Sequence, residues 1–173
     1  MRKYISMIMF GALAAFGFSA CDVETDEEAG GTNVVQMAGF WDVTIDIIDD
    51  AGNILDADPY GIGTTTLMTY NTVANVNTEM WLKLNGQGEF WDMQLIVPIN
   101  YGAKTFACGP TVCEAGNADA PQVTITDGKV LLGQGHNLHG LPTDSIVFTA
   151  KFDDPQDNQT YRIAGIKHSG FTE

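Results

Sequence analysis

Basic residues are scarce in this 173-residue sequence. Eight lysines and arginines stand against 22 aspartates and glutamates, which gives a formal net charge of −14 at pH 7. A chain of this charge is repelled by phosphate backbones and by anionic lipid headgroups, so we expect no nucleic-acid binding. Attachment to a membrane must therefore come from something other than charge.

A hydrophobic run long enough for a membrane-spanning helix, which needs ~18 residues, is also lacking at the N-terminus. The apolar run Tyr4–Phe18 follows the basic start Met1-Arg2-Lys3 and precedes small residues and Cys21. This order is typical of a secretory signal peptide over residues 1–20. A cysteine directly after the cleavage site is typical of a bacterial lipoprotein, so we expect Cys21 to carry acyl chains such as palmitate. The alternative is an ordinary signal peptide followed by a chance cysteine.

Large apolar groups are almost absent from residues 21–36. This stretch is acidic over Asp22–Glu28 and then contains glycine, which predicts a flexible tether before one folded domain over residues 37–173. An acidic cluster after an acylated cysteine resembles the export signal of surface lipoproteins in bacteroidete-type bacteria. We therefore expect a cell-envelope protein in the outer membrane, exposed on the surface, although a charged spacer fits the composition equally well.

Cysteine is rare as well, and Cys108 and Cys113 are the pair left once Cys21 is acylated. Gly109-Pro110 between them predicts a turn, and exported compartments are oxidising, so a local disulfide is favoured. A zinc site would need four ligands, and the histidines lie in another segment. We expect neither a metal nor another cofactor.

Motifs for nucleophilic catalysis are missing. Beyond residue 20 the serines are Ser145 and Ser169, and neither stands in a Gly-x-Ser-x-Gly motif. A cluster of Ser145, His139 and Asp144 would be a triad only if the fold gave it the right geometry. His136 and His139 are weak metal candidates, because residues three apart on a strand point to opposite faces.

No segment of the domain has a long helical period. Period-two alternation predicts a strand over Trp41–Ile47, with the odd-numbered apolar residues on one face. Similar patterns predict further strands at 64–71, 79–84, 89–97, 123–126, 129–132, 145–152 and 160–167. Asp127-Gly128 is a strong hairpin signal, Pro98 ends a strand or marks an edge, and 99–121 looks irregular. Eight short strands predict an all-β, eight-stranded antiparallel up-and-down barrel, because closure removes exposed edges.

The start of the first strand, Gly39-Phe40-Trp41, resembles the Gly-x-Trp signature of lipocalin-like (calycin) barrels. From Ala38 to Phe171 the chain is similar to a family of bacteroidete lipoproteins described as lipid-binding putative hydrolases. The similarity is carried by Gly39–Val43, Trp91-Asp92-Met93, Ala103–Phe106 and Ile163–Phe171. The resemblance implies that Gly39 and Trp41 form the barrel base and that a basic residue lies over the indole. Arg162 is the candidate for that residue and Lys167 is the alternative.

An eight-stranded barrel is just wide enough to be filled by side chains or to hold one small ligand. The residues expected to line such a ligand are Trp91, Met93, Leu95, Phe148, Phe152 and Tyr161. The resemblance thus implies a membrane-anchored lipoprotein that binds a lipid or another small apolar ligand. The alternative is an accessory surface lipoprotein that binds an envelope protein or a glycan through an exposed aromatic patch of Phe40, Trp81 and Phe90. Enzymatic activity is left open, since only the family description suggests a hydrolase.

Overall fold

The computed structural model describes residues 30–88, 90–113 and 121–170, and every regular element in them is a β-strand. The strands are β1 (Gly39–Ile48), β2 (Ile54–Ala57), β3 (Thr65–Tyr70), β4 (Glu79–Leu84), β5 (Met93–Asn100), β6 (Thr105–Val112), β7 (Gln122–His136), β8 (Pro142–Phe152) and β9 (Thr160–Lys167). Across these residues, no helix is long and apolar enough to cross a membrane.

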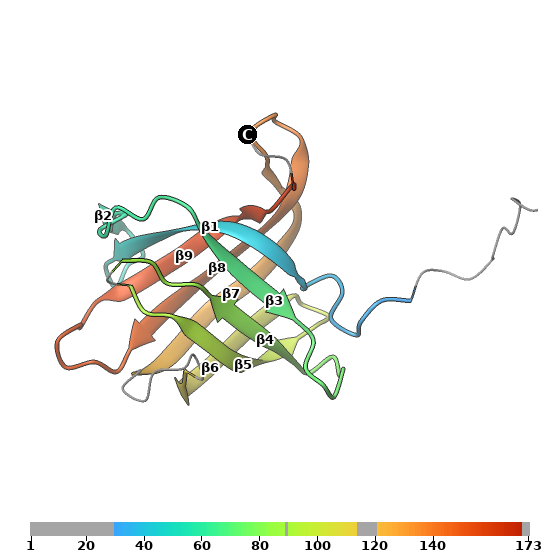
Figure 1. The fold of residues 1–173 in the computed structure, drawn as a ribbon, viewed down its shortest axis with the longest axis horizontal. Helices are drawn as coiled ribbons and strands as arrows, with labels where there is room; N and C mark the ends of the chain where they lie inside the picture. The colour runs from blue at the N-terminus through green and yellow to red at the C-terminus, as the bar shows by residue number, and fades with distance from the viewer. Residues whose placement is uncertain (1–29, 89, 114–120, 171–173) are drawn as a thin grey trace, which may run out of the picture. The chain divides into compact units, whose positions relative to one another are not determined.

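The strands form one antiparallel barrel in which, β2 aside, each strand pairs with its neighbours in the sequence (Figure 1). β1 and β9 close the barrel by pairing from Trp41↔Lys167 to Ile48↔Thr160. The two strands approach closely at Gly165, where a Cβ atom would lie 1.9 Å from the carbonyl oxygen of Asp42. β2 is a short extension that pairs with the end of β1. The predicted closed, eight-stranded, up-and-down barrel is confirmed.

The predicted hairpin at Asp127-Gly128 is wrong, because β7 runs through both residues. The pairing of β7 with β8 shifts between Thr126 and Lys129, which marks an irregularity of the bulge type. Asp127 has a φ of 55°, and a Cβ on Gly128 would lie 2.4 Å from the carbonyl oxygen of Phe106. Asp-Gly suits a bulge as well as a tight turn, since both need the left-handed region or a bare backbone.

Two strands were missed in segments that looked irregular. β6 occupies part of 99–121, which was expected to be irregular, and β2 lies between the first two predicted strands, where no strand was expected. Gly109 and Pro110 lie inside β6, where pairing with β7 overrides their low strand propensity. β5 also continues past Pro98 to Asn100. The predicted strands 123–126 and 129–132 are a single strand, β7, which removes one strand from the prediction. The unpredicted β6 adds one, so the barrel still has eight strands.

The barrel has two ends of different construction. The end where β1 begins is called the Trp41 end, and it carries the connections 31–38, 71–78, 101–104 and 137–141. The opposite end, where Ile47 pairs with Tyr161, is called the Tyr161 end and carries the connections 49–64, 85–92 and 153–159. In Figure 1 the Trp41 end lies toward the right and the Tyr161 end toward the left.

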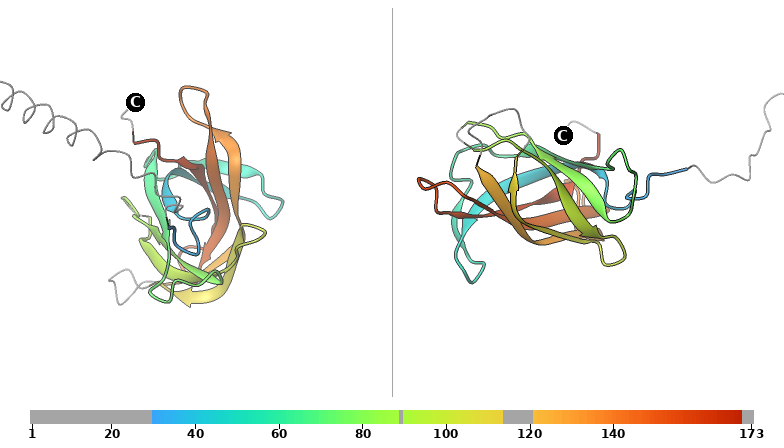
Figure 2. Two further views of the ribbon diagram at one scale, coloured as in Figure 1. Left: turned by 90° about the vertical axis from the view of Figure 1, so that its right-hand side faces the viewer. Right: turned by 90° about the horizontal axis from the view of Figure 1, so that it is seen from below.

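Inward-facing apolar side chains from all eight barrel strands form one buried cluster. Val34 and Met37, which precede β1, are also completely buried in it. Val34 lies inside the predicted flexible tether of residues 21–36, so that prediction is wrong from Gly31 onward, where the packed unit begins. Figure 2 shows this segment covering the mouth of the barrel. The predicted signal peptide and Cys21 lie outside the described residues.

Candidate functional site

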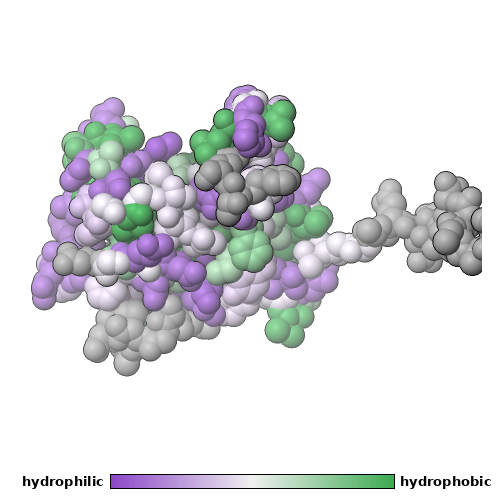
Figure 3. Space-filling model, turned by 45° about the horizontal axis from the view of Figure 1, so that its top comes forward, coloured by the Kyte–Doolittle hydropathy of each residue, from purple (hydrophilic) through white to green (hydrophobic). Residues whose placement is uncertain are grey.

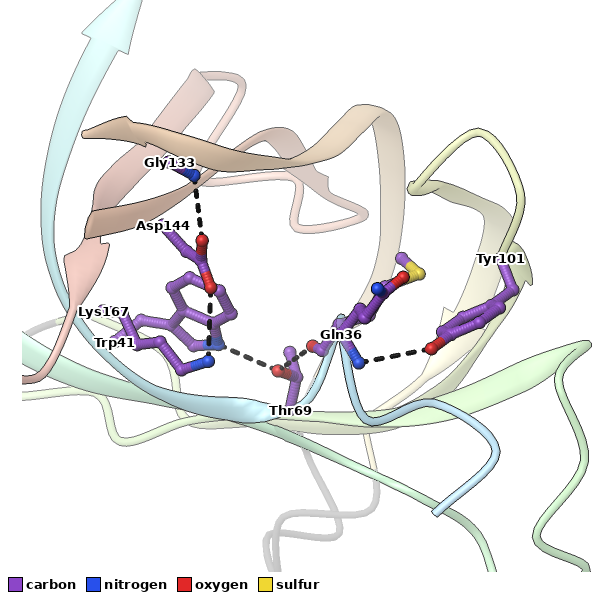
Figure 4. A network of polar contacts seen from close by, with 8 residues as sticks. Gln36, Trp41, Thr69, Tyr101, Gly133, Asp144 and Lys167 are labelled. Atoms are coloured by element: carbon purple, nitrogen blue, oxygen red, sulfur yellow. Dashed lines mark hydrogen bonds and ion pairs between the residues drawn. The ribbon is translucent and has the colours of Figure 1, made fainter. Parts of the chain in front are cut away.

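Trp41 closes one end of the barrel. Its side chain is fully buried, and its indole N–H donates a hydrogen bond of 2.8 Å to Oγ1 of Thr69. The Thr69 hydroxyl in turn donates to the carbonyl oxygen of Met37 at 2.6 Å. Figure 4 shows how this chain of contacts fastens the segment before β1 to the barrel floor. A buried indole N–H needs a hydrogen-bond acceptor, and Thr69 supplies the acceptor for Trp41.

Lys167, and not Arg162, lies over the indole. The Lys167 ammonium is 5.8 Å from the centre of the Trp41 ring, whereas Arg162 pairs with Asp46 at 3.5 Å. The reason is the alternation of β9: Tyr161 and Ile163 face the core, so Arg162 faces outward and Lys167 has the inward parity. The alternative left open by the sequence is thus the one that the structure shows.

Asp144 holds Lys167 in place. One carboxylate oxygen lies 3.3 Å from the Lys167 ammonium, and the other accepts a hydrogen bond of 2.9 Å from the backbone N–H of Gly133 (Figure 4). Ser145, the next residue, lies on β8 opposite Leu131 and Ile166. Both oxygens of Asp144 therefore serve the barrel base.

Aromatic rings close the Tyr161 end. The Tyr161 hydroxyl donates to Asp157 at 2.8 Å and accepts from the Tyr60 hydroxyl at 2.6 Å. Burial, followed by these two hydrogen bonds, raises the pKa of Tyr161 far above its usual value. Phe90 packs edge-on against Tyr161 at 5.0 Å between ring centres. The expected exposed patch is therefore wrong for Phe90, which is buried, while Phe40 is 59% exposed.

Five of the six residues expected to line a ligand lie together in the buried core: Met93, Leu95, Phe148, Phe152 and Tyr161. Trp91 is half-buried and packs against Phe152 with ring centres 6.5 Å apart. It borders a surface depression of about 280 Å³, together with Pro121 and residues 153–156. The five core residues are thus in place to meet a ligand that enters the barrel, and in this structure they pack against one another.

The wall of the barrel is weakest between β5 and β6. These strands form ladder pairs only at Ile99↔Phe106 and Asn100↔Thr105, beside their hairpin. The Ile99 N–H bonds to Thr78 on the β4 side, so by alternation Pro98 faces β6, where it has no N–H to donate. We call the stretch of wall between residues 94–98 and 107–112 the β5–β6 seam. Beside its hairpin end lies a groove of about 360 Å³, lined by Pro98, Ile99, Asn100, Thr105, Phe106, Ala107, Asp127, Gly128 and Lys129.

The expected disulfide is not formed in this structure, where Cys108 and Cys113 are free cysteines. The segment between them was predicted to be a turn, but it is the end of strand β6. A short disulfide loop needs the chain to fold back between the two cysteines, whereas a strand keeps the chain extended. The Cys113 thiol is buried, and burial raises its pKa to about 11 against an opposing hydrogen bond from the Gln94 backbone. Cys113 thus packs against β5 at the far end of the seam.

Polar side chains on the outer wall include one pair that sequence reasoning missed. Nδ1 of His168 lies 2.8 Å from a carboxylate oxygen of Asp42, an arrangement that can orient an imidazole as a general base. The residues are 126 positions apart, and only the pairing of the first and last strands brings them together. His136 and His139 lie at the tip of the β7–β8 hairpin, and the described residues contain no group of three or more His, Cys, Asp or Glu side chains that could hold a metal ion.

The comparison with known families agrees with this geometry. Residues 26–172 match the family described as lipid-binding putative hydrolase. The chain belongs to this family. The closed barrel with its apolar interior is consistent with a lipocalin-like fold, and family and fold together support a lipid-binding role for the chain. No curated protein matches the sequence.

Replacing Trp41 by alanine should lower the free energy of unfolding by ~3–5 kcal/mol, as for other buried aromatic truncations. Trp81→Ala is the matched control, because Trp81 is half-buried and stacks on Tyr70 at 6.3 Å. The Trp81→Ala variant should lose ~1 kcal/mol of unfolding free energy. Urea unfolding followed by circular dichroism measures both, and equal losses would contradict a closing role for Trp41.

Alkylation should distinguish the two thiols. A raised pKa leaves little Cys113 thiolate at pH 8, so its reaction with iodoacetamide should be slow and should speed up as the pH rises toward 11. Cys108 is only half-buried and should react first. Peptide mass spectrometry after timed labelling reads both sites. If neither Cys108 nor Cys113 reacts until a reductant is added, the two cysteines form a disulfide instead.

Proposed function

We propose that the barrel binds the acyl chain of a lipid, or a similar small apolar ligand, which enters between its core side chains through the β5–β6 seam. The observation that carries this proposal is the seam itself, since two ladder pairs hold β5 to β6 while β1 and β9 pair along eight positions. Behind the seam lie Met93, Leu95 and Val97, all buried and apolar. A wall that lacks ladder hydrogen bonds can part at lower cost than any other part of the barrel.

Rearrangement of the core would provide room for a ligand. Met80 and Met93 are both completely buried, and Met80 pairs with Val97 across β4 and β5. Methionine is unbranched and has several rotatable bonds, so it adapts to a changed volume more easily than leucine or isoleucine. An acyl chain that displaces these side chains would exchange one set of apolar contacts for another. Binding of this kind depends on shape more than on charge.

Uptake of a fluorescent fatty acid by the purified protein tests the proposal, together with native mass spectrometry for co-purified lipid. Ala107→Arg places a charged side chain in the groove beside the seam without touching the core, because Ala107 is exposed. It should slow uptake, whereas Ala103→Arg, another exposed alanine outside the groove, should not. Absence of any uptake and of bound lipid in the unmodified protein would refute lipid binding. Equal rates in the two variants would place the entrance elsewhere.

We also propose that Cys21 carries the acyl anchor and that the domain is held at the cell envelope, in the outer membrane. The order of basic start, apolar run, small residues and cysteine supports this. Metabolic labelling with palmitate should mark the wild-type chain in the membrane fraction. The label should be lost in Cys21→Ser and kept in Cys108→Ser, and a labelled Cys21→Ser chain would contradict the anchor.

A further inference from the structure

The connections at the two barrel ends differ sharply in charge. Those at the Tyr161 end, residues 49–64, 85–92 and 153–159, carry eight aspartates among their described residues and no lysine, arginine or histidine. Those at the Trp41 end, residues 31–38, 71–78, 101–104 and 137–141, contain no acidic residue, one lysine and one histidine. The negative charge of the connections is therefore concentrated at the Tyr161 end, although Asp42, Glu79 and Asp144 lie on strands near the Trp41 end.

Exposed apolar side chains show the opposite distribution. Of the large hydrophobic residues that the structure describes as exposed, most lie at or beside the Trp41 end: Val35, Phe40, Val73, Val76, Leu132, Leu138 and Leu141. Leu138 and Leu141 are 80% and 61% exposed at the tip of the β7–β8 hairpin. Figure 3 shows apolar surface on this protruding hairpin. The other exposed large hydrophobic residues are Ile54 and Leu55 on β2 and Val112 at the end of β6.

Aromatic side chains with polar atoms surround the same end. Tyr70 stacks on Trp81 on the outer wall, and Tyr101 lies in the β5–β6 hairpin beneath the Lys104 ammonium, 4.0 Å from its ring centre. Tyrosine and tryptophan are enriched where protein meets the membrane–water interface, because one part of the ring is apolar and the other is polar. The Lys104 ammonium donates a hydrogen bond to the carbonyl oxygen of Tyr101, so this cation is held at the Trp41 end.

The chain also enters the barrel at this end. Gly31 begins the packed unit, and Val34 and Met37 fix the entering segment into the Trp41 end. Whatever precedes residue 31, including the cysteine proposed as the anchor, is joined to the barrel there. The stretch between that cysteine and Gly31 is short, so an anchor there favours an orientation in which the connections of the Trp41 end, and not the aspartate-rich ones, face the bilayer.

We propose that the Trp41 end is a membrane-docking surface on which the barrel rests, with Leu138, Leu141 and Val73 in the interfacial layer of the bilayer. This inference rests on the anchor in the proposed function, but it does not require a ligand inside the barrel. Exposed leucine and valine gain free energy when they leave water, and the absence of acidic residues in these connections avoids repulsion by anionic headgroups. The Tyr161 end then points away from the membrane.

Quenching of tryptophan fluorescence by brominated phosphatidylcholine tests this orientation. The full chain, purified with its anchor and reconstituted into such vesicles, would carry Leu138→Trp, Val73→Trp or the control Leu55→Trp. Leu55 is 66% exposed on β2, so the control has similar exposure at the opposite end. We expect loss of the added emission for Leu138→Trp and Val73→Trp, and none beyond the wild-type signal for Leu55→Trp. Two probes on separate connections keep the result decisive if one variant does not fold.

Quenching at Leu55→Trp equal to that at the other two positions, or quenching at none, would overturn the proposal. A blue shift of the Leu138→Trp emission that depends on protein concentration without vesicles would also overturn it, since a second copy would then cover this end. A brominated lipid inside the barrel would quench Trp41 and Trp91 alike in every variant and in wild type. Failure of lipid uptake and failure of docking are therefore read from different signals.

Discussion

The pairing of β1 with β9 is the contact on which the rest of the structure depends. It joins the first and last strands of the barrel and converts an open meander, with two exposed edges, into a closed wall. It also places Lys167 opposite Trp41 and brings Asp42 to His168. Gly165 permits this contact, because a side chain there would collide with the backbone of β1.

Closure gives the two ends of the barrel separate environments. In an up-and-down barrel, successive connections alternate between the ends, so residues that are mixed along the sequence become sorted in space. Here the sorting places the aspartate-rich connections around Tyr161 and the partly apolar connections, which contain no acidic residue, around Trp41. Among the connections that the structure describes, the negative charge thus belongs to one end, which is the asymmetry on which the proposed membrane docking rests.

The wall itself is uneven in strength. β1 and β9 pair along their whole shared length, whereas β5 and β6 pair only beside their hairpin. Pro98 contributes to this difference, because its backbone faces β6 and has no N–H to donate a hydrogen bond. The barrel is therefore closed firmly between β1 and β9 and joined loosely between β5 and β6, and the proposed entry of a ligand rests on this difference.

The sequence by itself determined the fold class, most strand positions and the role of Trp41 as a buried residue, because period-two alternation depends on local residues alone. β4 and β9 have the bounds that the alternation predicts, 79–84 and 160–167. It did not distinguish a bulge from a hairpin at Asp127-Gly128, since both use the same backbone conformations. Nor did it locate β6, whose Gly109 and Pro110 are held in a strand by pairing with β7. Tertiary structure alone decided which basic residue lies over Trp41 and that Asp42 contacts His168. It also decided that the charges of the connections separate between the two ends. Each of these results depends on strands that are distant in sequence lying side by side.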